Sequence, residues 1–302
     1  MNTEGFLHEY RQVRNNKPLS PRSKRVYREY LERLDGYLRE HGFTFPNLTK
    51  NQFSQFLDEQ PWGSSSRYNA LAAAKAYRRW GTDDDPDDDH PLVKHSLPRD
   101  PTGPLPTPKK AQLDKLFKSF DLRTILAIRA YLAALLAQET GLRANEIATI
   151  KRDDVDLENL EFRIVVKGGF EWITPFPESV RDAVKRWLPA RDRLAQDGVD
   201  TLFVALKGTR RIDGKYVSAV GYPLTRHGVK LMFYRMTEKA GIGRYSPHAF
   251  RRSFCTDAVE RNVNLRLIQM QGRWRSMRMV ELYSKTASPQ AFRGHFGGFG
   301  EA

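Results

Sequence analysis

Apolar side chains recur at helical spacing near the beginning of the chain. Ser20-Pro21 is a typical helix start, because serine caps the first turn and proline suits the first helical position. Apolar side chains then repeat every three or four residues, at Val26, Tyr27, Tyr30, Leu31, Leu34 and Leu38. Gly42 is the expected end of this helix. The pattern therefore predicts one amphipathic helix with a buried apolar stripe.

Two shorter helices are predicted after it. A capping-box pattern at Thr49 and Gln52 starts the first of them. The second covers 66–80 and ends at Gly81. Residues 1–81 are therefore expected to form a small all-helical domain. Its basic side chains are Arg22, Lys24, Arg25, Arg28, Arg67, Lys75, Arg78 and Arg79.

The segment 82–107 differs in composition from both of its neighbours. It contains the run DDDPDDDH at 83–90, and six prolines follow between 91 and 108. Proline at this density interrupts helices and central strands. We therefore expect an interdomain linker here. A cation site at the aspartates is less favoured, because metal sites need ligands that converge from several directions.

The pattern after the linker predicts a larger domain built mainly of helices. Thr107-Pro108 resembles another capped helix start. Residues 125–137 are apolar nearly all round, which is typical of a central buried helix, and Gly141 is its expected end. Further helices are predicted at 178–188, 226–240, 247–261, 265–271 and 276–284.

One β-hairpin interrupts these helices. Residues 160–166 and 172–176 carry alternating, β-branched positions, and the turn signal Lys167-Gly168-Gly169 lies between them. The predicted fold class is therefore mainly α with a small β-hairpin or sheet, an α+β domain over 108–288. The Gly-rich segment 289–302 is expected to be a tail outside this core.

The net charge of the chain and its distribution indicate what kind of molecule the protein binds. The 302 residues suit two domains, and 50 Lys and Arg against 36 Asp and Glu give a formal charge of +14. The net charge is +6 over 1–80, −5 over 81–108 and +13 over 109–302. Two basic bodies flanking an acidic connector favour a polyanionic partner, most often nucleic acid. Solubility alone is the alternative explanation of the charge.

Cysteine content and hydropathy exclude other classes. The single cysteine, Cys255, rules out an intrachain disulfide framework. The longest apolar stretch, 125–137, is shorter than the roughly 20 residues that span a bilayer. The first residues lack an apolar signal region. We therefore expect a cytoplasmic protein with no membrane association.

Candidate chemistry comes from five short motifs in a fixed order. We find no paired cysteines, HExxH, Walker A or GxGxxG. The five motifs are TGLRANEI (140–147), VVKGGFEWITPFP (165–177), HAFRRSF (248–254), GRW (272–274) and ELYSK (281–285).

The residue types in these motifs suit phosphate chemistry. His248 and Arg251 share one face of a predicted helix whose positive N-terminus attracts anions. Arg143 follows a helix junction, where its guanidinium can reach a phosphate oxygen as a bidentate donor. Tyr283 carries a phenolic oxygen that can attack phosphorus. Taken singly, each residue has a structural explanation: a surface charge, a structural pair, or one of 12 tyrosines.

The series Arg143, Lys167, His248, Arg251, Trp274 and Tyr283 resembles the tyrosine site-specific recombinase (integrase) family over 109–285. Lys167 lies eight residues before Pro175 and Trp274 nine before Tyr283, the intervals of that family. The helical domain 1–81 resembles the family's core-site-binding domain.

The resemblance implies metal-free DNA strand exchange without a cofactor, through a 3′-phosphotyrosyl intermediate at Tyr283 and a Holliday junction. Arg143 and Arg251 would neutralise the phosphate, His248 would act as general base or hydrogen-bond partner, and Lys167 as general acid. Glu146 would orient the site. The implied partners are double-stranded DNA with a specific core site, a second protomer on each site, and a homotetramer at synapsis.

Two departures from the family pattern qualify the resemblance. Arg273 stands where the family usually has glycine, so both Trp274 and Arg273 are candidates for the sixth active-site position. The hairpin turn reads GGFEW where many relatives have a basic turn, so we expect weaker DNA contact there.

Other functions fit part of the pattern. A type IB topoisomerase uses a similar set of residues to relax supercoils, and a non-catalytic DNA-binding relative would lack the nucleophile or an arginine. Within the recombinases, the length argues against an additional arm-type DNA-binding domain. A dimer-resolution enzyme and the integrase of a phage or mobile element fit equally well. The tail with Phe292, Phe296 and Phe299 either packs onto a neighbouring protomer or is disordered.

Overall fold

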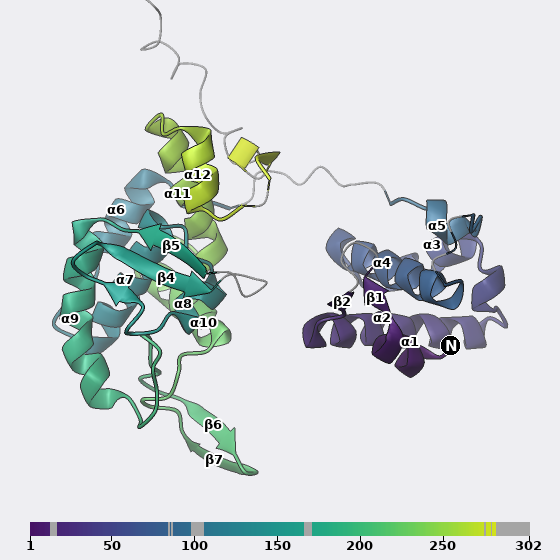
Figure 1. The fold of residues 1–302 in the computed structure, drawn as a ribbon, viewed down its shortest axis with the longest axis horizontal. Coiled ribbons are helices and arrows are strands. Elements are labelled where there is room, and N and C mark those ends of the chain that lie inside the picture. The colour runs from purple at the N-terminus through teal and green to yellow at the C-terminus, as the bar shows by residue number, and fades with distance from the viewer. Residues whose placement is uncertain are drawn as a thin grey trace, which may run out of the picture. The chain divides into compact units, whose positions relative to one another are not determined.

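The chain forms helical units with small antiparallel sheets, as its pattern predicts. The computed structural model describes residues 1–12, 17–83, 85, 87–97, 106–165, 171–274, 276–278 and 280–281. They belong to two compact units that divide after residue 103. Figure 1 shows the helices and strands of each unit, and each unit has its own apolar core.

The first unit is almost wholly helical. Its elements are α1 (Thr3–Glu9), β1 (Arg11–Gln12), β2 (Lys17–Pro18), α2 (Pro21–Glu40), the short 3-10 helix Phe45–Asn47, α3 (Lys50–Asp58), α4 (Ser64–Gly81) and α5 (Pro91–Lys94). The predicted caps are confirmed. The Ser20 hydroxyl accepts a hydrogen bond from the Ser23 N–H at 3.1 Å, and the capping box starts α3. Gly42 adopts a left-handed φ of +67° where α2 ends.

Two α-helices of this unit, α1 and α5, were not predicted. Helix α1 has only seven residues, too few to show a helical repeat. Phe6 is nevertheless fully buried, with its ring stacked on Tyr27 at 6.3 Å and edge-on to Trp80 at 5.9 Å. Helix α1 therefore completes the core that α2 and α4 begin.

The predicted linker begins too early. The Arg78 guanidinium on α4 forks onto the carboxylate of Asp88, at 2.9 and 3.0 Å. Leu92 on α5 is fully buried in the core of the first unit, and the His90 ring lies 3.3 Å from the Phe45 carbonyl oxygen. Local composition hides these contacts, because one buried leucine and one ion pair are enough to dock a proline-rich segment.

The second unit combines helices with two separate sheets. Its elements are α6 (Lys110–Lys118), α7 (Ile125–Glu139), α8 (Ala144–Thr149), β3 (Val155–Asp156), β4 (Glu161–Val165), β5 (Glu171–Pro175), α9 (Glu178–Leu194), β6 (Thr209–Ile212), β7 (Lys215–Ser218), α10 (Arg226–Lys239), α11 (Pro247–Glu260) and α12 (Leu265–Gln271). The start at Thr107-Pro108 is displaced, since Lys109 is the N-cap of α6. The predicted helix 276–284 is described only at 276–278 and 280–281, and the tail 289–302 lies outside the described residues.

Helix α7 is the centre of this unit, as predicted. It contacts α8, α9, α10 and α11, and Leu132 and Leu136 are fully buried. Its one cation, Arg129, is also buried and donates to the Val204 carbonyl at 2.7 Å. Burial lowers the pKa of Arg129 to about 10, so the guanidinium keeps its charge at neutral pH.

The sheet that supports the candidate site has three antiparallel strands in the order β3-β4-β5. The predicted hairpin is confirmed as β4 and β5, with Phe162 opposite Thr174 and Ile164 opposite Trp172. Strand β3 has two residues and was not predicted. The five residues between β4 and β5, Lys167 among them, lie outside the described part.

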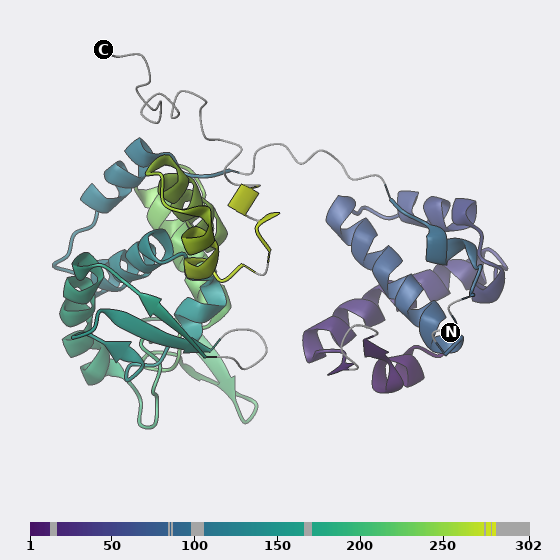
Figure 2. The same ribbon diagram turned by 45° about the horizontal axis from the view of Figure 1, so that its top comes forward.

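A second hairpin, β6–β7, was also missed. It stands out from the body of the second unit in both views (Figures 1 and 2). Asp213 and Gly214 form its turn with φ of +47° and +79°, the Asp-Gly pattern of a type I′ turn. The flanking strands are rich in Arg and Lys and show little apolar alternation. Within the described segments, no helix is both long and apolar enough to cross a membrane.

Candidate active site

The junction between α7 and α8 places the first arginine of the motif series. Gly141 has a left-handed φ of +62°, and a Cβ there would lie 2.8 Å from the Phe254 ring of α11. Only glycine fits both the turn and this close approach. The chain then turns so that Arg143 is the N-cap of α8 and Glu146 lies one turn further on.

Arg143 and Glu146 form a close pair. The Arg143 Nη1 lies 2.6 Å from Glu146 Oε1, and the Arg143 main-chain N–H donates to Oε2 at 2.8 Å. The side chain of Arg143 is 34% exposed and that of Glu146 only 6%. Burial raises the pKa of the Glu146 carboxyl, but the nearby Arg273 and Arg143 outweigh it and hold the pKa below its usual value. Glu146 is therefore a buried anion that orients Arg143.

Helix α11 brings the second arginine to the same place. Pro247 occupies its first turn, and His248 and Arg251 follow at the predicted spacing. Arg251 is 4% exposed and donates to the carbonyl oxygens of Gly141 and Gly272. The structure thus brings together the α7–α8 junction, α11 and the turn after α12.

That turn carries the two candidates for the sixth position. Trp274 is 9% exposed, and the Arg251 Cζ lies 4.3 Å from the centre of its ring. Arg273 points elsewhere, with its Nη2 3.1 Å from Glu146 Oε2. The indole of Trp274 therefore covers the guanidinium of Arg251. The Arg273 guanidinium contacts the same Glu146 carboxylate as Arg143.

Gly272 makes this packing possible. A Cβ at Gly272 would lie 1.9 Å from the Trp274 ring. We expect Gly272→Ala to destabilise the second unit by about 1–3 kcal/mol, because the indole has to move. The thermal unfolding midpoint should fall by about 2–4 °C per kcal/mol.

A matched substitution should act in the opposite direction. Gly36 lies inside α2, and nothing approaches a Cβ there within 4 Å. Gly36→Ala should stabilise the first unit by about 0.5–1 kcal/mol, since alanine suits helix interiors better. An unchanged midpoint for Gly272→Ala would contradict the packing of Trp274.

His248 lies beside the two arginines and is exposed. The surrounding atoms still remove enough water from its ring to lower its pKa, and the charges of Arg251, Arg226, Arg252 and Arg143 lower it further. A lowered pKa keeps the imidazole neutral to lower pH than a free histidine. At neutral pH the ring can therefore accept a proton.

The cause of this shift can be tested on the free protein. Arg226 is exposed on α10, and its charge is one of the causes of the lowered pKa. In an NMR titration, the His248 pKa is expected below its usual 6.5, and Arg226→Gln should move it upward. Arg235→Gln removes an exposed charge from the same helix and should leave it unchanged. Equal effects of both variants would mean that general surface charge sets the shift.

Two of the six motif residues, Lys167 and Tyr283, lie outside the described residues. Arg143, His248, Arg251 and Trp274 come from three separate segments and lie together. Sequence reasoning missed Thr174 on β5, whose hydroxyl lies 3.1 Å from Arg273 Nη1. Thr174 is fully buried within a strand, and its place in the sequence does not indicate that its hydroxyl contacts Arg273.

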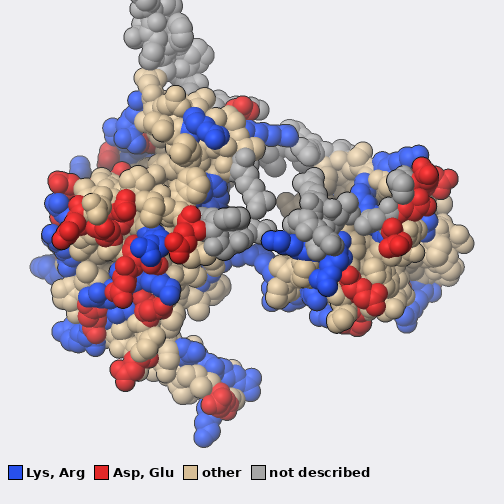
Figure 3. Space-filling model, in the orientation of Figure 1, with Lys and Arg blue, Asp and Glu red and all other residues tan. Residues whose placement is uncertain are grey.

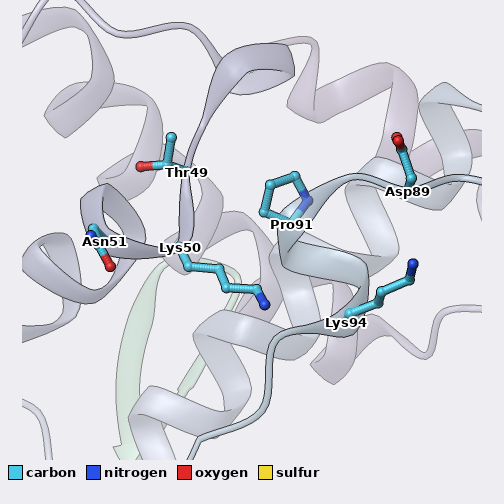
Figure 4. A pocket seen from close by; sticks show the side chains of 6 residues that line it. All are labelled: Thr49, Lys50, Asn51, Asp89, Pro91 and Lys94. Atoms are coloured by element: carbon cyan, nitrogen blue, oxygen red, sulfur yellow. The ribbon is translucent and has the colours of Figure 1, made fainter.

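The first unit carries exposed cations of its own. A hollow is lined by Thr49, Lys50, Asn51, Asp89, Pro91 and Lys94, and Lys50 extends from α3 toward α5 (Figure 4). Other basic residues of this unit form ion pairs with acidic residues of the same unit. Arg28 and Arg67 are paired with Glu4 and Asp58, each at 2.7 Å.

Hairpin β6–β7 is an exposed basic element of the second unit. Lys and Arg side chains gather on it in the space-filling view (Figure 3), and its cations are Arg210, Arg211 and Lys215. Tyr216, which is 77% exposed, lies opposite Arg211 in this hairpin. Arg210 lies over the ring of Tyr222 at 4.0 Å, which fixes the base of the hairpin.

The sequence pattern of the phage integrase family matches residues 109–289, more than half of the chain. The chain belongs to this family. The match contains all five motifs and every residue of the site described above.

This integrase-family chain is similar to several curated tyrosine recombinases. It is 29% identical to tyrosine recombinase XerC of Roseiflexus castenholzii over 88% of this chain and 82% of that protein. It is 28% identical to XerA of Thermococcus kodakarensis over 88% and 85%. The match spans only about half the length of the XerC proteins of Corynebacterium efficiens and C. glutamicum, 47% and 45%.

Solved structures share the fold of this integrase-family chain. XerH site-specific recombinase bound to a palindromic difH substrate superimposes with a TM-score of 0.71, at 22% identity, over 96% of this chain and 82% of that one. The integrase of transposon Tn1549 in complex with transposon right end DNA gives 0.69, at 21% identity, over 98% of both chains. The expected recombinase fold is therefore confirmed.

Proposed function

We propose that this protein is a site-specific DNA recombinase that cuts and rejoins DNA through Tyr283 without a metal ion. One observation carries the proposal. Arg143 and Arg251, 108 residues apart in the chain, are both held by the turn after α12, because Arg143 donates to the Arg273 carbonyl and Arg251 to the Gly272 carbonyl. Two guanidiniums fixed together suit one phosphodiester, because each can bind one of its non-bridging oxygens.

The proposed cleavage step assigns a role to each motif residue. The phenolic oxygen of Tyr283 forms a bond to phosphorus, and the bond from phosphorus to the 5′ oxygen breaks. His248 takes the phenol proton, and its lowered pKa keeps the ring ready to accept it. Lys167 protonates the departing 5′ oxygen. The phosphotyrosyl ester keeps the bond energy for joining to a second strand.

Electrostatic stabilisation is assigned to Arg143 and Arg251, which neutralise charge as it develops on the phosphate. Glu146 orients Arg143. Trp274 takes the sixth position, because its ring covers the Arg251 guanidinium. In this role it packs against the site and keeps water out.

DNA is the proposed partner. The net charge of +14 and the exposed cations of hairpin β6–β7 suit phosphate contact, and binding should weaken steeply with salt. The Tn1549 integrase structure is a complex with transposon right end DNA, and the XerH structure is bound to a palindromic difH substrate. We propose two protomers on each core site and a tetramer at synapsis.

The test is capture of covalent adducts. Purified protein is incubated with genomic DNA of its host in the presence of a chelator, and DNA fragments linked to protein are isolated and sequenced. Adducts at one defined sequence are the expected result. They would identify the target site and the independence from metal in one experiment.

Other outcomes point to the alternatives. Adducts scattered without sequence preference would indicate a type IB topoisomerase. DNA binding without any adduct would indicate a non-catalytic relative and overturn the proposal.

A further inference from the structure

Arg273 combines two unfavourable features that a glycine at this position would avoid. Its backbone is left-handed, with φ of +53°, a conformation that residues with a Cβ rarely adopt. Its side chain is 3% exposed, so a cation is removed from water. The Arg273 Nε has no hydrogen-bond partner among the described residues. A residue held under these conditions is a candidate for a specific task.

The guanidinium of Arg273 connects three separate segments. Its Nη1 donates to the Thr174 hydroxyl on β5 at 3.1 Å and to the Gln271 carbonyl at 2.6 Å. Its Nη2 donates to the Gly141 carbonyl at 3.2 Å and to Glu146 Oε2 at 3.1 Å. Arg273 thus links the sheet, the α7–α8 junction and the end of α12.

Arg143 is held by Arg273 in two ways. The two guanidiniums share one carboxylate, because Glu146 Oε1 accepts from Arg143 and Oε2 from Arg273. In addition, Arg143 Nη2 donates to the main-chain carbonyl of Arg273 at 3.0 Å. The Arg273 carbonyl sets the direction in which the Arg143 guanidinium points. The shared Glu146 carboxylate sets how much of the positive charge of Arg143 is neutralised.

Because Arg143 and Arg273 share the Glu146 carboxylate, Arg143 keeps more of its capacity to bind a phosphate. A buried carboxylate paired with a single arginine would neutralise it and compete with the phosphate for its N–H groups. With Arg273 on its second oxygen, the three groups Arg143, Glu146 and Arg273 carry a net charge of +1. Arg273 is also the largest of the causes that lower the pKa of Glu146.

We propose that Arg273 is a positioning residue for cleavage: it balances the charge of Glu146 so that Arg143 remains available to the scissile phosphate. The inference rests on the proposed cleavage function. Arg273 itself does not contact the substrate in this scheme.

A matched pair of variants tests the charge alone. Arg273→Lys and Arg273→Met have unbranched side chains of similar length, impose the same backbone demand and both lose the guanidinium fork. Only lysine keeps the positive charge beside Glu146. The measurements are the rate of covalent adduct formation at saturating DNA on the mapped site, the dissociation constant for that site, and the thermal unfolding midpoint.

A positioning role and a merely structural role predict opposite orders. If Arg273 balances Glu146, Arg273→Met should cleave about 10–100-fold more slowly than the wild type, a loss typical of residues that orient an active-site group. Arg273→Lys should cleave at least about tenfold faster than Arg273→Met, with the same DNA affinity. A merely structural side chain favours methionine, because a buried apolar group is tolerated better than a buried ammonium. Arg273→Met cleaving as fast as Arg273→Lys would overturn the proposal.

A milder variant keeps the test decisive if both substitutions unfold the protein. Thr174→Val removes the hydroxyl that holds Arg273 Nη1 and preserves the side-chain volume. Cleavage should slow severalfold at a temperature at which the variant is still folded, and an unchanged rate would overturn the proposal. A wild-type protein that forms no adduct would instead contradict the proposed function itself.

Discussion

Tyr283→Phe protein is expected to bind its DNA site as tightly as the wild type and to form no covalent adduct with it. The substitution removes one oxygen atom, the proposed nucleophile, and keeps the ring. Because no other group replaces the lost nucleophile, adduct formation should fall by at least about 10⁴-fold. The measurement is single-turnover adduct formation on a labelled duplex that carries the mapped site.

A second tyrosine serves as the control. Tyr216 on hairpin β6–β7 is 77% exposed and has no assigned role in cleavage. Tyr216→Phe should form adducts at the wild-type rate. Residual adducts in Tyr283→Phe at more than a few per cent of that rate would show that another residue is the nucleophile.

Arg251→Ala is expected to reduce the cleavage rate by about 10²–10³-fold, as the loss of one preorganised donor group does in other enzymes. It should also destabilise the second unit. The carbonyl oxygens of Gly141 and Gly272 accept from this guanidinium, and leaving buried acceptors without a partner costs about 1–3 kcal/mol. Adduct formation is therefore measured below the unfolding temperature of the variant.

The control removes a cation from the far end of the same helix. Arg261 follows α11, is 61% exposed and pairs with Asp257 at 3.0 Å. Arg261→Ala should leave cleavage unchanged, since surface pairs of this kind contribute little. Equal losses in both variants would mean that the total charge of the helix, and not the placement of Arg251, determines the rate.

Local rules predicted the elements whose signals are local. The caps at Ser20 and Thr49 and the hairpin β4–β5 each rest on residues within a few positions of one another. Helix α1 and hairpin β6–β7 were not predicted, because neither carries a clear local pattern. Helix α1 is too short to show a helical period, and the hairpin shows little apolar alternation, so that only Asp213-Gly214 marked it.

The candidate site shows the same division. The order and spacing of the motifs selected six candidate residues, and the four of them that the structure describes, Arg143, His248, Arg251 and Trp274, lie together. The direction in which Arg273 points was not predictable. It depends on a left-handed backbone and on Glu146 and Thr174, which are 127 and 99 residues away in the chain. No short sequence window contains both ends of such a contact.

These long separations have a consequence during synthesis. Arg251 contacts a carbonyl 110 residues earlier, and Arg143 contacts one 130 residues later. Domains fold largely as units as the chain leaves the ribosome, so Arg143 and Arg251 cannot be brought together in this way before residue 274 has emerged. Tyr283 follows only nine residues afterwards. If the proposed cleavage function holds, a nascent chain that has not yet reached Tyr283 has neither the assembled arginines nor the nucleophile with which to cut DNA.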